Sequence, residues 1–129
     1  MLVARIFLAV VAVLYVCLGI WCAAAPETTS AKVGLSRVGE GGKSEFFTVY
    51  GGLEVGIGLA LLALAATSGT AMAGLMACLA IHGGLVLFRS ISFALYDAAH
   101  GFTLRLAIGE WVIFLVSLGL YFFLRQLSR

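Results

Sequence analysis

Four ionisable side chains interrupt stretches of sequence that are otherwise apolar. They are Glu54, His82, Arg89 and Glu110. An ionisable residue is costly inside a bilayer, so it usually faces the interior of a helix bundle, pairs with another polar group and marks a site for a ligand or a proton. Carboxylate and imidazole groups can act as general acids and bases, and a guanidinium binds carboxylates and polar head groups. These four residues are therefore the first candidates for a ligand-binding or proton site.

The formal charges of this group do not cancel. Two carboxylates and one guanidinium leave one negative charge in excess when the histidine is neutral. We expect either that one glutamate carries a proton or that a cation or polar head group enters the site. The alternative is purely structural: Arg89 pairs with Glu110 or with Glu54 to hold the helices together, and no ligand binds. His82 is likewise either an acid–base group or a hydrogen-bonded core residue.

Other chemically active residues contribute less to this site. Asp97 and His100 belong to a short polar segment, where they could form a gate or an acid–base pair at the mouth of the site, or simply be solvated. The three cysteines lie in apolar runs, without a CxxC pair or a Cys/His spacing suited to a metal. We therefore expect no metal and no cofactor, and we interpret the cysteines as small apolar residues.

The elements that position these residues follow from the composition. The chain has 129 residues, of which 63% are hydrophobic and 11% are charged, whereas a soluble domain carries about a quarter charged residues. A helix of about 20 apolar residues crosses a bilayer. Four segments have this length and character. We predict an all-α integral membrane four-helix bundle in a single domain, with helices at residues 2–25, 46–66, 71–96 and 104–124.

The connections between these helices differ in length. Residues 67–70 and 97–103 are short polar turns, so the helices on either side of each turn must be antiparallel neighbours. Residues 27–45 form a longer loop outside the membrane, and their content of glycine and serine predicts a flexible or irregular path. The net charge of the chain is only +2 and no run of Lys or Arg occurs, which argues against nucleic acid as a partner.

Helix geometry predicts that the candidate site is a layer. At a rise of about 1.5 Å per residue, four of its members lie about 9 to 15 Å below the face that carries the long loop. These members are Tyr15, Glu54, Arg89 and Glu110. His82 lies about 10 Å deeper. The helix at 46–66 also carries a strip of small residues at four-residue steps, a pattern that lets membrane helices approach closely. The small-residue strip consists of Gly52, Gly56 and Ala60.

Several motifs coincide with the predicted layer and its surroundings. They are Tyr50-Gly51-Gly52, Glu54, Gly56-Ile57-Gly58, Arg89-Ser90, Asp97, Gly101 and Glu110. Through these motifs, residues 46–124 resemble a family of small four-span bacterial membrane proteins of unknown function, loosely the DoxX group. The resemblance implies four spans and a multi-pass location in a bacterial inner (plasma) membrane. It implies no activity.

Three functions fit these observations. The first is a binding or carrier protein that accepts a lipid-like or other apolar small molecule, with its polar head near Glu54, Arg89 and Glu110. The second is a non-catalytic accessory subunit or a homo-oligomer that uses the small-residue strip as its contact face. The third is a membrane enzyme, an isomerase or reductase, with a glutamate and His82 as acid and base. No cofactor motif accompanies the third, so we favour a function without catalysis. Membrane lipids are partners in all three.

Overall fold

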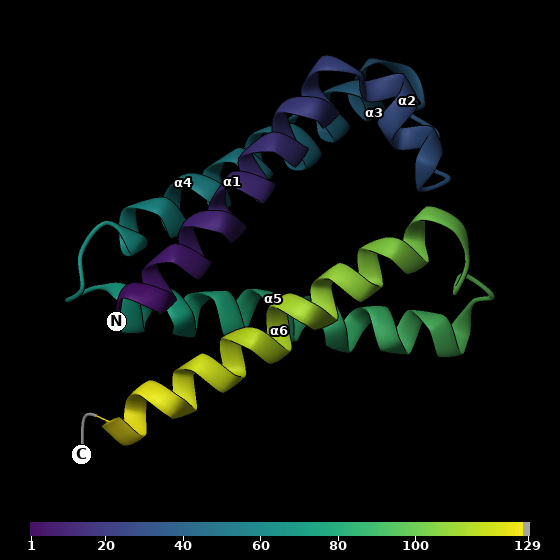
Figure 1. Cartoon of the computed structure of the whole chain (residues 1–129). Coiled ribbons are helices and arrows are strands. Elements are labelled where there is room, and N and C mark those ends of the chain that lie inside the picture. Colours follow the sequence, from purple (N-terminus) through teal and green to yellow (C-terminus); the bar gives the residue numbers. More distant parts are fainter. Residues whose placement is uncertain (128–129) are drawn as a thin grey trace. The chain divides into compact units, whose positions relative to one another are not determined.

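The computed structural model describes residues 1–127, and every regular element in this range is a helix (Figure 1). The predicted all-α class is therefore confirmed. In chain order, the elements are α1 (Leu2–Ala24), α2 (Pro26–Lys32), α3 (Gly39–Phe46), the π-helix η1 (Phe47–Leu53), α4 (Glu54–Ala65), α5 (Ala71–Leu95) and α6 (Gly101–Leu127).

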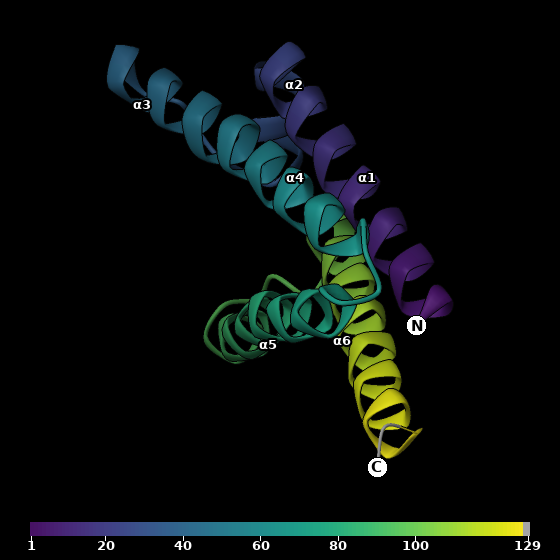
Figure 2. The ribbon, with the colours of Figure 1, turned by 90° about the vertical axis from the view of Figure 1, so that its left-hand side faces the viewer.

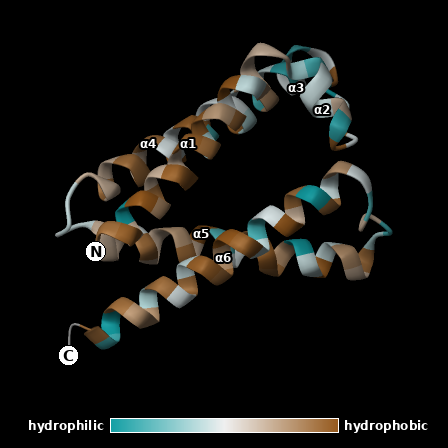
Figure 3. Cartoon of the chain, in the orientation of Figure 1, coloured by the Kyte–Doolittle hydropathy of each residue, from teal (hydrophilic) through white to brown (hydrophobic). Residues whose placement is uncertain are grey.

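Four helical stretches are long and apolar enough to cross a bilayer. They are Leu2–Ala24, Gly39–Ala65, Ala71–Leu95 and Gly101–Leu127. Hydrophobic residues dominate these stretches, whereas hydrophilic residues gather on α2 and α3 (Figure 3). Most large apolar side chains of the long helices face outward, as expected of helices whose solvent is lipid. The chain is thus a multi-pass, all-α membrane protein.

The segment between the first two spans differs from its prediction. The predicted flexible or irregular path is wrong for most of residues 27–45, because the helices α2 and α3 occupy this segment. Pro26 takes the first position of α2, where its missing N–H costs nothing. Gly34 ends this helix with a φ of +71°, its N–H bonded to Ala31 O and that of Leu35 to Ser30 O. This is a Schellman motif, which satisfies the last carbonyls of a helix.

Two further boundaries also differ from the sequence prediction. The second span starts at Gly39 rather than residue 46, because α3 continues through η1 into α4 without a break. The last span starts at Gly101 rather than residue 104, and it continues to Leu127 rather than ending at 124. Gly101 has a φ of +60°, which lets the chain turn sharply into the helix at a residue without a Cβ. The residues at these helix ends include polar ones, so a prediction based on hydropathy places the helix ends too far inward.

The chain folds as two compact units. Residues 9–63 form the first unit, and residues 1–8 with the chain from Leu64 onward form the second. The first unit holds most of α1 and α4 together with α2, α3 and η1, and the second holds α5 and α6. The single domain predicted from the sequence requires that the two units pack into one, and this stays a prediction.

In the first unit, α1 and α4 run side by side (Figures 1 and 2), and glycines bring their backbones together. A Cβ added at Gly19 of α1 would lie 2.7 Å from Gly51 O and 2.9 Å from Val55 N. One added at Gly58 would lie 2.7 Å from Ala12 O. These distances leave no room for a side chain, so Gly19, Gly51 and Gly58 form the seam between the two helices.

In the second unit, α5 and α6 form a hairpin, and the start of α1 is tied to the end of α4. Arg5 donates from Nε to Ala65 O at 2.8 Å and from Nη2 to Ala66 O at 2.6 Å. Thr70 donates to Leu64 O at 2.8 Å. The last two carbonyls of α4 and the one directly after it thus receive hydrogen bonds that the helix cannot supply, and the positive charge suits the negative end of the helix dipole.

Candidate functional site

The second unit contains an ion pair between its two spanning helices. Arg89 of α5 donates from Nε to Glu110 Oε2 at 3.0 Å and from Nη2 to Glu110 Oε1 at 2.6 Å. The side chains are 25% and 13% exposed, respectively. This two-pronged geometry is the strongest form of an arginine–carboxylate contact. The contact with Glu110 is one of the two pairings considered for Arg89 from the sequence.

A small polar cluster lies on the same two helices, more than one helical turn from the Arg89–Glu110 pair. His82 Nδ1 donates to Cys78 O at 2.9 Å, since a carbonyl can only accept. Ser117 of α6 donates to Ile113 O at 2.7 Å and lies 3.3 Å from Cys78 Sγ. His82, Cys78 and Ser117 are all buried. The environment of His82 matches the hydrogen-bonded core residue that was one of its two interpretations.

Glu54 belongs to the first unit, where it is the first residue of α4 and directly follows η1. One of its carboxylate oxygens, Oε2, is buried. Cys22 of α1 lies near this carboxylate, and Tyr15 is buried on the same helix. No Lys, Arg or His occurs at residues 9–24 or 46–65, the parts of the spans that belong to this unit. Glu54 is therefore an acidic group set in an apolar helix pair.

The helix around Glu54 contains a feature that the sequence did not suggest. A regular α-helix was expected over 46–66, but Phe47–Leu53 is π-helical. Such segments are rare and occur frequently at functional sites. Two consecutive glycines, Gly51 and Gly52, are a weak signal for irregular helix geometry.

The predicted layer divides between the two units. Arg89, Glu110 and His82 lie in the second unit, whereas Glu54 and Tyr15 lie in the first. Their meeting in one layer stays a prediction. Asp97 and His100 are exposed in the connection between α5 and α6, and their role as a gate also stays a prediction.

The small-residue strip takes no part in the contact between α1 and α4. That contact uses Gly51 and Gly58, on another side of the helix. In contrast, a Cβ added at Gly52 or Gly56 would meet nothing within 4 Å, and Ala60 is exposed. The strip therefore remains available to another helix.

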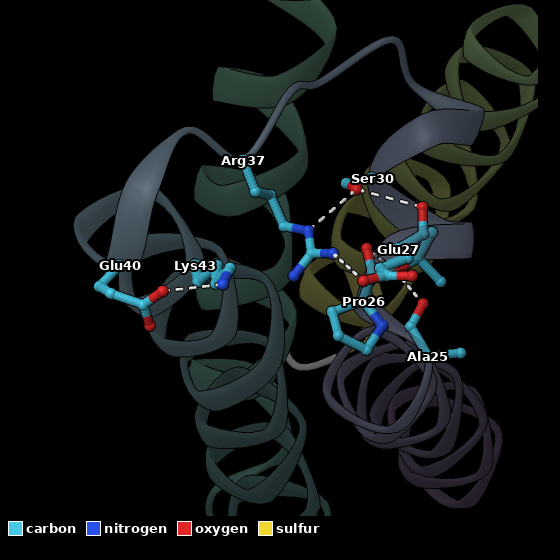
Figure 4. A network of polar contacts seen from close by, with 8 residues as sticks. Ala25, Pro26, Glu27, Ser30, Arg37, Glu40 and Lys43 are labelled. Carbon is cyan, nitrogen blue, oxygen red and sulfur yellow. Dashed lines mark hydrogen bonds and ion pairs between the residues drawn. The ribbon is translucent and has the colours of Figure 1, made fainter.

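A polar network in the connection between the first two spans was also not predicted from the sequence (Figure 4). Arg37 donates from Nε to Ser30 Oγ at 3.3 Å, and its Nη2 lies 3.6 Å from Glu27 Oε1. Its guanidinium also lies over the ring of Phe46, 5.9 Å from the centroid. Arg37 thereby ties the connection between α2 and α3 to both helices. The helix-start signal at Pro26 and the helix-stop signal at Gly34 could have revealed that this segment is ordered.

The described residues offer few ligands for an ion. Within residues 1–127, no three His, Cys, Asp or Glu side chains are grouped so as to hold a metal. The three cysteines are free thiols, with Cys22 and Cys78 buried and Cys17 exposed. No family model, curated protein or solved structure matches the chain.

Proposed function

We propose that this protein binds or carries a lipid-like or other apolar small molecule whose polar head meets the carboxylate of Glu54. The observation that carries the proposal is the position of Glu54. One oxygen of its carboxylate, Oε2, is buried, and the spanning residues of its own unit, 9–24 and 46–65, contain no Lys, Arg or His. A partly buried carboxylate in a span is costly, and a binding role explains why it is retained there.

The chemistry of Glu54 narrows the class of ligand. A carboxylate accepts hydrogen bonds, so the head group should carry N–H or O–H donors or a positive charge. The outward-facing apolar side chains of α4, such as Leu59 and Leu62, favour a ligand that arrives through the bilayer. The π-helix directly before Glu54 supports a functional role for this position. A bacterial inner membrane is part of the proposal through the resemblance to the DoxX group.

The test is native mass spectrometry of protein purified in mild detergent. Wild-type protein should retain a small molecule that Glu54→Gln loses, because a hydrogen bond to a charged group contributes about 1.5–3 kcal/mol, equivalent to about 10- to 150-fold in affinity. Glu45→Gln, an exposed carboxylate at the end of α3, is the matched control and should retain the molecule. Equal retention by Glu54→Gln and wild type would remove the proposal.

A second function is favoured by the free small-residue strip. Assembly of the chain with a second copy or with an accessory membrane subunit would use Gly52, Gly56 and Ala60, because an added Cβ meets nothing at either glycine and small residues allow close helix contact in lipid. An enzymatic role has less support, since the Nδ1 of His82 is committed to the carbonyl of Cys78.

We expect Gly56→Leu to abolish a dimer or higher oligomer, because a large side chain would separate backbones that pack through the strip. Native mass spectrometry in lipid nanodiscs measures the oligomeric state. Gly84→Leu is the matched control, since Gly84 on α5 is equally open, and this variant should assemble like wild type. Only monomers in wild-type preparations would exclude self-assembly through this strip.

A further inference from the structure

The connection between α2 and α3 presents two apolar side chains outside the spans. Leu35 is 41% exposed and Val38 is 80% exposed. Glycines with left-handed backbone conformations stand on both sides of them, Gly34 with a φ of +71° and Gly39 with a φ of +63°. These two turns, which residues with a Cβ rarely adopt, define a short tip at residues 35–38.

Hydrogen bonds and an ion pair hold the tip in a defined conformation. Arg37 lies between Leu35 and Val38 in the sequence, and it points inward to Ser30 and Glu27 (Figure 4). The backbone N–H of Leu35 is bonded to Ser30 O at 2.9 Å. The ordered backbone thus keeps two neighbouring apolar side chains exposed together, which makes the tip a candidate contact surface.

The length of the second span sets the height of the tip relative to the bilayer. Residues Gly39–Ala65 form one helix of 27 residues, which at about 1.5 Å per residue is about 40 Å long. A bilayer is about 40–45 Å thick with its head groups. Arg5 and the exposed turn after Ala65 mark one surface of the membrane. Gly39 therefore reaches the head-group region at the other surface, and the tip precedes it directly.

Neighbouring residues also have the character of a membrane interface. Lys32, the last residue of α2, places its Nζ 5.8 Å from the ring centroid of Trp21, near the end of α1. Tryptophan and lysine are the residues that anchor helices at head-group level. In Figure 1, α2 turns sideways from the end of α1 instead of continuing along it. The tip at the end of α2 thus stays near the level at which α1 leaves the apolar region.

We propose that Leu35 and Val38 insert into the head-group region of the bilayer that the chain spans, so that the α2–α3 connection is an interfacial anchor. The partner of this surface is lipid. Apolar side chains next to basic ones, lying along the interface, gain both apolar burial and attraction to lipid phosphates. This anchor is independent of the ligand proposed for Glu54.

The test uses tryptophan fluorescence of Val38→Trp in nanodiscs, with Trp21→Phe and Trp111→Phe as the background. We expect phosphatidylcholine brominated on its acyl chains to quench the fluorescence of Val38→Trp strongly. Aqueous iodide should quench this fluorescence at least about twofold more weakly than it quenches the control, because the residue lies at the interface. The control is free N-acetyltryptophanamide in the nanodisc buffer, which reports how strongly iodide quenches an indole fully exposed to water.

Each other outcome overturns the anchor. Quenching of Val38→Trp by iodide, at the level of the control and without quenching by brominated lipid, would place the tip in water. Protection from both quenchers would show that protein covers it, either a second copy or another subunit. The substitution is at an exposed position, and retention of the wild-type thermal transition confirms that the variant is folded.

Discussion

Arg89→Met is expected to destabilise the α5–α6 hairpin by about 3–5 kcal/mol, the usual cost of removing one partner of a buried ion pair. The variant would leave the carboxylate of Glu110, 13% exposed, without its two hydrogen bonds from Arg89. Unfolding in lipid bicelles, followed by steric trapping, measures the free energy of unfolding. The double variant Arg89→Met/Glu110→Leu should recover most of the loss, because a pair of apolar residues can replace a buried ion pair with little change in stability.

The matched control for this prediction is Lys43→Met. Lys43 also pairs with a glutamate, Glu40, at 2.8 Å, but both side chains are exposed. Such a pair contributes about 0–1 kcal/mol, so this variant should unfold close to wild type. A loss in Arg89→Met no larger than that of Lys43→Met would contradict a stabilising role for the inter-helix pair.

Gly58→Ala should cost about 1–3 kcal/mol, the range for overpacking a tight contact. The added Cβ would lie 2.7 Å from Ala12 O and 3.0 Å from Val16 N. Both atoms belong to backbone, which cannot move aside as a flexible side chain can, so α1 and α4 must separate. The same steric-trapping measurement, with labels on α1 and α4, reports the change.

Gly56→Ala provides the comparison for Gly58→Ala, two residues away on the same helix. Its added Cβ meets nothing within 4 Å, and alanine is a better helix former than glycine by about 1 kcal/mol. It should be neutral or slightly stabilising. If the two alanine variants unfold alike, the seam between α1 and α4 does not depend on close backbone contact.

The sequence predicted the class and the number of spans because bilayer thickness restricts what an apolar run of about 20 residues can be. It could not predict the ends of the helices equally well. The predicted first helix ended at residue 25, directly before Pro26, and the prediction missed that this proline begins a further helix, α2. The π-helix at Phe47–Leu53 had only one weak signal in the sequence, the consecutive glycines Gly51 and Gly52.

The sequence nominated residues for the candidate site, but it did not pair them. The cost of charge inside a bilayer singled out Glu54, Arg89 and Glu110. The contact between Arg89 and Glu110 required a structure, since helix depth alone places both glutamates within reach of Arg89. The glycines of the seam could not be singled out for a related reason. The helix of η1 and α4 carries glycines on two neighbouring sides, and only the contacts of α1 reveal that Gly51 and Gly58 pack against it.

The hydrogen bonds of Arg5 have a consequence for biosynthesis. Arg5 and Ala65 are 60 residues apart in the chain, and at a synthesis rate of about 5–20 residues per second the carbonyl is made about 3–12 s after the guanidinium. During this interval the guanidinium must be solvated by water or lipid phosphates. These hydrogen bonds can form only after Ala65 and Ala66 have been synthesised, so that the end of α4 completes the anchoring of the first helix.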